Sequence, residues 1–220
     1  MTSPGSTIIV ATPFGPAHLL LDGQAFAATP TAPPPAALVV IGHGASGDSD
    51  APDILAVRDA LLTAGCAVAR TVQPYRVAGR RVPTPVAQLD ACFALLVAEA
   101  RSRVAAPVPL VVGGRSNGAR VAARSASALG AAAVLALSFP LHPPGRPDRS
   151  RASELAGAGV PAFVLQGQRD TFGSPTELAA AVPGPHIHPI PGAGHSPRPG
   201  PALTEAAMLA AQWVLRSVRN

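Results

Sequence analysis

The sequence predicts an α/β fold, in which helices cover both faces of a doubly wound, mostly parallel sheet. Short apolar runs of β type alternate with longer segments of helical spacing over most of the chain. Some runs, such as Leu38–Ile41, are continuously apolar, as expected of strands that helices cover on both faces. With 220 residues, the chain is long enough for one full core, and we expect a single domain over residues 1–220.

The chain opens on two apolar runs, Ser6–Ala11 and Ala17–Leu21, that a Pro/Gly turn separates, which predicts an antiparallel pair at the sheet edge. The proline-rich residues 28–36 predict a loop. Further strands are expected at Leu38–Ile41, Cys66–Val72, Val108–Val112, Ala131–Ser138, Ala162–Gln166 and His186–Ile190. Helices are expected at Pro52–Ala64, Pro85–Val104, Ser116–Leu129, Arg151–Ala158, Ser174–Ala181 and Ala202–Val218. We expect loops at Pro74–Pro85 and 140–150.

The composition argues against partners such as nucleic acid or membrane. Arginine supplies all 17 positive charges, giving a net charge of +5, yet only 13% of residues are charged and 4% are aromatic. Few aromatic rings leave few platforms for stacking bases. No apolar run approaches the roughly 18–20 residues of a membrane span, and the N-terminus lacks the basic and apolar regions of a signal peptide. We expect a cytoplasmic protein, with the Ala, Gly, Pro and Arg bias of a GC-rich bacterial genome.

Two cysteines, Cys66 and Cys92, are too few for a disulfide framework or a metal cluster. Both fall in apolar patterns, so we expect them to be buried small hydrophobic residues. The sequence therefore predicts no metal and no cofactor.

Gly114-Arg115-Ser116-Asn117-Gly118 matches the G-x-S-x-G pattern of a nucleophile elbow. Such a turn holds a serine in strained geometry between a strand and a helix, and small neighbours avoid clashes. The pattern alone is weak evidence for a nucleophile, because a chain with 21 glycines can match it by chance. The alternative interpretation is a glycine-rich turn with an ordinary serine. Its context fits, because an apolar strand precedes it and a helical segment follows. We predict that Ser116 is a nucleophile.

The apolar strand that ends in His43-Gly44-Ala45 lies about 70 residues before the serine, where an enzyme of this type places its second oxyanion donor. We expect the backbone N–H groups of Ala45 and Asn117 to form the oxyanion hole. His43 is expected to orient this loop, with contact to a substrate as a further candidate role.

A serine hydroxyl needs a base to take its proton, and the base follows the serine and an acid along the chain. The histidines after the serine are His142, His186, His188 and His195. His186 and His188 fall in the last strand, where packing roles are expected. His195 lies in a glycine-rich loop between the last strand and the final helix. We predict that His195 is the base.

Asp170 follows the penultimate strand and is predicted to be the acid, because catalytic groups gather where parallel strands end. Asp148, in the loop after the preceding strand, is the competing acid, although a solvated surface charge is the favoured interpretation for it.

These motifs together resemble the α/β-hydrolase superfamily. GGRSNGAR, PYRVAGRRVPTP and SFPLHPPGRP are similar, more narrowly, to a small dienelactone-hydrolase-like family related to testis-expressed proteins and to a regulatory subunit of a histone-acetyltransferase complex. The resemblance runs from about residue 36 to 218. It implies an α/β-hydrolase fold and a triad of Ser116, Asp170 and His195. Dienelactone hydrolases use a cysteine nucleophile, whereas neither Cys66 nor Cys92 lies at an elbow here.

The short chain leaves no room for a lid domain, so the pocket should be open, roofed at most by Phe139–Arg149. Phe139, Phe172 and Arg115 are candidate substrate contacts, with a salt-bridged strut as the alternative for Arg115. Three arginines lie in the expected loop Pro74–Pro85: Arg76, Arg80 and Arg81. We expect them to brace this loop or to bind an anionic group.

The sequence thus favours a serine hydrolase that cleaves a small ester or thioester through an acyl-enzyme. The alternatives are an acyltransferase with the same triad and an inactive scaffold that binds a protein partner. The intact Ser/Asp/His set argues against the scaffold. The natural substrate and the oligomeric state stay open.

Overall fold

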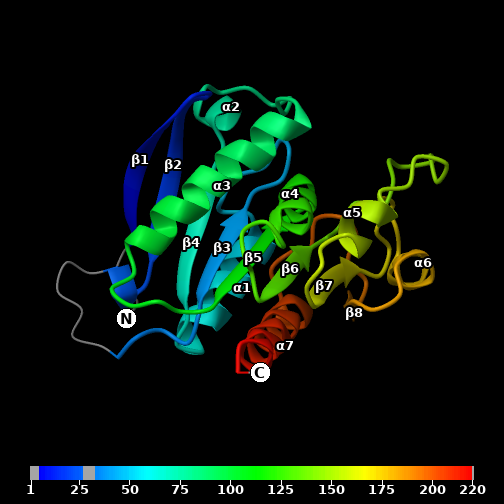
Figure 1. The fold of residues 1–220 in the computed structure, drawn as a ribbon. Coiled ribbons are helices and arrows are strands. Elements are labelled where there is room, and N and C mark those ends of the chain that lie inside the picture. Colours follow the sequence, from blue (N-terminus) through cyan, green and yellow to red (C-terminus); the bar gives the residue numbers. More distant parts are fainter. Residues whose placement is uncertain (1–4, 27–32, 220) are drawn as a thin grey trace.

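The computed structural model describes residues 5–26 and 33–219, which form an eight-stranded sheet covered by helices (Figure 1). The strand order is β1-β2-β4-β3-β5-β6-β7-β8. β1 pairs antiparallel with β2, and β2 pairs antiparallel with β4, whereas the pairs from β4 to β8 are parallel. The predicted α/β-hydrolase fold is confirmed, and the antiparallel pair lies at the sheet edge. Residues 27–32 of the expected proline-rich loop lie outside the described part.

The strands occupy β1 Ser6–Thr12, β2 Gly15–Asp22, β3 Leu38–Gly42, β4 Ala67–Val72, β5 Leu110–Arg115, β6 Ala133–Leu137, β7 Ala162–Gly167 and β8 His186–Ile190. The α-helices occupy α1 Pro52–Thr63, α2 Pro74–Val77, α3 Val86–Ser102, α4 Asn117–Ser125, α5 Ala152–Ala156, α6 Pro175–Ala181 and α7 Pro201–Ser217.

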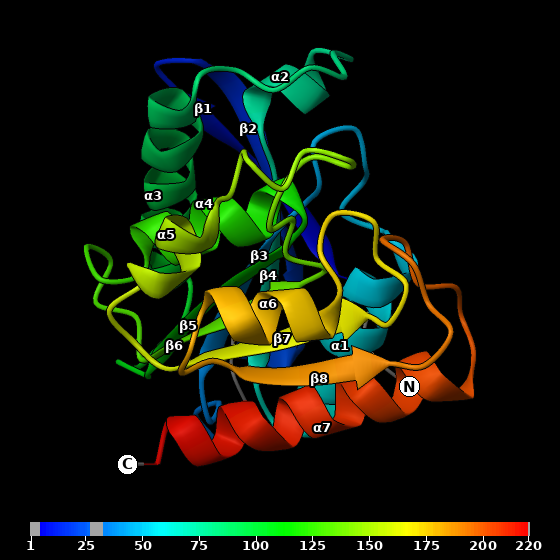
Figure 2. The ribbon, with the colours of Figure 1, turned by 90° about the vertical axis from the view of Figure 1, so that its right-hand side faces the viewer.

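Side chains of each central strand point alternately to the two faces of the sheet, and each face carries its own core. Leu38 and Val40 of β3 pack in the core under α3, α4, α5 and α6. Val39 and Ile41 pack in the opposite core, under α1 and α7. Figure 2 shows α7 and α1 on one side of the sheet, with α3, α4 and α5 on the other. This two-sided burial explains why the central strands are apolar throughout.

Several element bounds differ from the predicted ones, and two of these differences lie near the site. The segment Pro74–Pro85 is not all loop, because α2 begins at Pro74, whose fixed backbone angle suits a first helical position. β5 begins and ends later than the predicted Val108–Val112, extending through Gly113 and Gly114 to Arg115. The extension brings the strand directly to the serine turn. A 3₁₀ turn at Gln24–Phe26 was not predicted.

α4, which begins directly after Ser116, is tied to its neighbours by a network of ion pairs. Glu154 of α5 accepts from Arg120 at 2.6 and 2.7 Å and from Arg124 at 3.0 Å. Arg124 also donates to Asp90 of α3 at 2.6 and 2.9 Å. Burial tends to raise the pKa of Glu154, but the bonds and charges of the two arginines outweigh it and lower this pKa.

We expect Glu154→Gln to lower the free energy of unfolding by about 1–3 kcal/mol near neutral pH, because two arginines lose their partner. A lowered pKa in the folded protein means that this stability is present above the ordinary value of 4.5 and is lost as pH falls through the folded-state pKa. Urea unfolding from about pH 7 to about pH 4 should therefore show the difference from wild type shrinking. Glu205→Gln, on the exposed face of α7, is the control and should change little. A difference that grew on acidification would contradict the expectation.

No helix in the described part of the chain combines the length and the apolar character that crossing a bilayer requires.

Candidate active site

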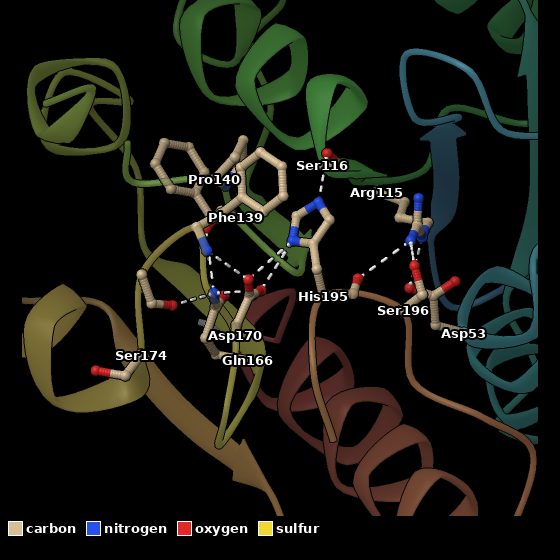
Figure 3. A network of polar contacts seen from close by, with 12 residues as sticks. Asp53, Arg115, Ser116, Phe139, Pro140, Gln166, Asp170, Ser174, His195 and Ser196 are labelled. Atoms are coloured by element: carbon tan, nitrogen blue, oxygen red, sulfur yellow. Dashed lines mark hydrogen bonds and ion pairs between the residues drawn. The ribbon is translucent and has the colours of Figure 1, made fainter. Parts of the chain in front are cut away.

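Three residues from distant parts of the chain meet where the parallel strands end (Figure 3). Ser116 lies between β5 and α4, Asp170 follows β7, and His195 follows β8. Nε2 of His195 lies 2.9 Å from Oγ of Ser116. Nδ1 of the same ring lies 2.9 and 3.1 Å from the two carboxylate oxygens of Asp170. A neutral imidazole that donates from Nδ1 to the carboxylate leaves Nε2 free to accept the serine proton.

The turn at Ser116 has the strained backbone of an elbow. Ser116 has a backbone φ of 53°, a value that residues other than glycine rarely adopt. A Cβ atom at Gly118 would lie 2.5 Å from the carbonyl oxygen of Gly42, and one at Gly114 would collide with Gly118. Only glycine fits where α4 crosses β3 and β5 so closely. α4 therefore begins directly after the serine, and the positive partial charge of its N-terminus lies at the site.

Asp170 is fixed by donors other than His195. Asp170 is only 4% exposed. Its carboxylate accepts hydrogen bonds from Nε2 of Gln166 at 2.9 Å and from the N–H of Phe172 at 2.8 Å. Gln166 is fully buried and also donates to the carbonyls of Phe139 and Gly173. Sequence reasoning missed Gln166, although a polar side chain in the otherwise apolar strand β7 was a usable signal.

The loop of the predicted oxyanion residue Ala45 is braced from α2. Tyr75 donates its hydroxyl to the carbonyl of Ala45 at 2.8 Å, and burial raises the pKa of Tyr75 to about 12, which keeps it a neutral donor. Gly44 lies against the serine, since a Cβ there would be 3.6 Å from Cβ of Ser116. The N–H groups of Ala45 and Asn117 donate to no other described residue, so both are free to bind an oxyanion.

His43 orients this loop and has no polar atom left for a substrate. Its Nδ1 donates to the carbonyl of Gly44 at 2.7 Å, and its Nε2 accepts from the N–H of Gln73 at 3.0 Å. Burial lowers the pKa of His43, which keeps the ring neutral as this pattern requires. Of the two roles predicted for His43, the structure favours loop orientation.

The three other candidate substrate contacts differ in their placement. Phe139 is fully buried in the core, which argues against the predicted contact with a substrate. The preceding Ser138 has a positive φ of 51°. Phe172 is partly exposed and stacks on His195, with ring centroids 4.1 Å apart. Arg115 forms an ion pair with Asp53 and hydrogen bonds with His195 and Ser196, which favours the strut over the substrate contact.

The competing groups lie elsewhere. Asp148 is exposed and pairs with Arg146 at 3.0 Å, and this bond lowers its pKa. Arg76 donates to the carbonyl of Arg80 and to Asp48, which is the loop-bracing role, whereas Arg80 and Arg81 are exposed.

Cys66 and Cys92 are buried, and burial raises the pKa of each thiol to about 11, so neither is a ready nucleophile. Within residues 5–26 and 33–219, no group of three His, Cys, Asp or Glu side chains is placed to hold a metal ion.

Known proteins share this fold. No curated protein sequence matches the chain. A lidless serine hydrolase from Xanthomonas campestris is 19% identical, with 100% of this chain and 95% of that chain covered at a TM-score of 0.69. Dienelactone hydrolase from Anabaena variabilis is 20% identical, with 98% of both chains covered at a TM-score of 0.67. Est1E from Butyrivibrio proteoclasticus is 14% identical, with 97% and 99% covered at a TM-score of 0.75. At these identities the likeness concerns the fold.

The family comparison goes further than the fold. A family described as the alpha/beta hydrolase domain matches residues 35–211, which is well over half of the chain and includes Ser116, Asp170 and His195. The chain belongs to the α/β-hydrolase family.

Proposed function

We propose that this protein is a serine hydrolase that cleaves a small carboxylic ester or thioester through an acyl-enzyme. The observation that carries the proposal is the continuous line of hydrogen bonds from Ser116 through His195 to Asp170, with distances of 2.9 Å at each step. Such a line activates an otherwise poor nucleophile and fixes the tautomer of its base. The uninterrupted sheet from β1 to β8 supports one domain as the carrier of this activity.

In the first half of the proposed reaction, Oγ of Ser116 attacks the carbonyl carbon while its proton passes to Nε2 of His195. The negative charge that develops on the carbonyl oxygen is stabilised by the N–H groups of Ala45 and Asn117 and by the N-terminal dipole of α4. Asp170 stabilises the imidazolium. The intermediate then collapses, the bond to the alcohol or thiol breaks, and His195 returns its proton to that leaving group.

In the second half, water replaces the leaving group. His195 takes a proton from the water, whose oxygen attacks the acyl-enzyme carbonyl, and the same donors stabilise the second oxyanion. The acid leaves, and Ser116 regains its proton from His195. The absence of a separate lid domain from the described residues supports small or accessible substrates.

A fluorophosphonate probe tests the proposal, because it reacts with activated serines. The wild-type protein should be labelled at one site, and Ser116→Ala should lose the label completely, since the attacking oxygen is gone. Ser138→Ala is the matched control: Ser138 also has a positive φ, but its hydroxyl is buried, so this variant should label like wild type. Equal labelling of wild type and Ser116→Ala, or none of the wild type, would overturn the proposal. A screen of acetyl, butyryl and octanoyl p-nitrophenyl esters would then define the substrate class.

A further inference from the structure

The side chain of Arg115, directly before the serine, joins three segments around the site. Nε donates to Asp53 of α1 at 3.1 Å, and Nη2 donates to the carbonyl oxygen of His195 at 3.1 Å and to Oγ of Ser196 at 2.6 Å. Figure 3 shows the guanidinium between Asp53 and the loop that carries His195 and Ser196. One residue of the elbow thus holds the backbone of the proposed base.

The Arg115–Asp53 pair is well shielded from water. The side chains of Arg115 and Asp53 are 12% and 3% exposed. A Cβ at Gly44 would lie 2.8 Å from Nη1 of Arg115, so the remaining edge of the guanidinium packs against the loop of Ala45. A planar group held from three sides has a defined position, unlike a surface arginine that is free to move.

The loop before His195 has a separate tether from the other direction. Arg169 donates its side chain to the carbonyl of Gly192 at 2.6 and 3.2 Å and its N–H to the carbonyl of Ala193 at 2.8 Å. Arg169 therefore holds residues before His195, and Arg115 holds His195 itself and the residue after it. Between these tethers, the loop is rich in glycine and has little intrinsic stiffness.

We infer that Arg115 is a positioning residue, whose fork of donors, anchored on Asp53, fixes the backbone of His195 and so keeps the imidazole between Ser116 and Asp170. The inference rests on the proposed function. An error of about 1 Å in the position of a catalytic group is enough to lower a rate by about 10²-fold, so the tether acts on the chemical step without touching the substrate.

Lysine at this position separates charge from geometry. Arg115→Lys keeps a positive charge for Asp53, but a single ammonium cannot replace the planar fork that reaches Asp53, His195 and Ser196 together. The matched control is Arg124→Lys on α4. Arg124 is also a partly buried arginine, 17% exposed, that pairs with carboxylates, but its partners are Asp90 and Glu154. Both changes should lower the melting temperature by a few degrees.

Two measurements distinguish positioning from stability. With p-nitrophenyl acetate, Arg115→Lys should lower kcat by about 10–10²-fold with KM nearly unchanged, while Arg124→Lys keeps the wild-type kcat. In NMR spectra of protein labelled at histidine, the ring signals of His195, assigned by their loss in His195→Ala, should shift in Arg115→Lys and not in Arg124→Lys.

The spectra test the positioning role even if the wild type hydrolyses no ester, so failure of the inference and failure of the proposed function are distinguishable. Unchanged ring signals in Arg115→Lys would overturn the inference. If Arg115→Lys does not fold, Arg115→Ala combined with Asp53→Ala removes both buried charges together and leaves neither unpaired. The same shift of the His195 signals is expected there, and wild-type signals would again contradict it.

Discussion

His195→Ala should lower kcat/KM for p-nitrophenyl acetate by about 10⁵–10⁶-fold, which is the scale of losing the base in a serine protease. Without the imidazole, the hydroxyl of Ser116 has no acceptor for its proton, and the leaving group has no donor. The ring is 18% exposed and lies on a loop, so its removal should leave the sheet intact.

His186→Ala is the matched control for this experiment. His186 stacks on Phe163 at the far edge of the sheet, with ring centroids 4.9 Å apart, and should change kcat/KM less than about twofold. Circular dichroism checks that both variants are folded. A His195→Ala protein that retained activity within about tenfold of wild type would remove His195 as the base.

Asp170→Asn should lower kcat by about 10²–10⁴-fold, somewhat less than the loss known for this change in a serine protease. The amide oxygen can still accept from the N–H of Phe172, but the amide nitrogen then faces donors on Gln166 and His195. The imidazole is driven to its other tautomer, in which Nε2 carries a proton and cannot accept one from Ser116. KM should change little, because the carboxylate does not touch the substrate.

Asp148→Asn is the comparison that decides which carboxylate is the acid. Asp148 is exposed and paired with Arg146 within its own loop, so its kcat should stay within about twofold of wild type. Melting temperatures of both variants are needed, since Asp170 also braces the turn to Phe172. If Asp148→Asn were the crippling change and Asp170→Asn mild, the acid would be misassigned although the fold would stand.

The sequence predicted the parts of the molecule in which local pattern and tertiary environment agree. The β3 run is continuously apolar because helices cover both of its faces, and β8 has the predicted bounds His186–Ile190. Ser116, Asp170 and His195 were predicted as one site because each follows a strand of a parallel sheet, and such strand ends converge at one edge. The structure places these three side chains within hydrogen-bond distance of one another.

The sequence could not predict features that depend on where a side chain points and which distant groups it contacts. Phe139 follows β6 as Asp170 follows β7, yet its ring is buried in the core. The acidic residue Asp53 reads as an ordinary first-turn helix residue, and only the three-dimensional structure shows its bond to Arg115. The role of Gln166 likewise depends on acceptors from three separate residues, which no local pattern brings together.

The register of β5 bears on the order in which the chain folds. β5 pairs with β3 on one side, matching Leu38 to Leu110, and with β6 on the other. The β3–β5 pairing closes a segment of about 70 residues, an entropic cost that must be met before the contact stabilises anything. The left-handed backbone of Ser116, whose N–H donates to Leu137 of β6, is tenable only once both neighbours of β5 are in place. We therefore expect the strained serine turn to form late in folding, and refolding protein should become reactive toward the fluorophosphonate probe only after the central sheet has closed.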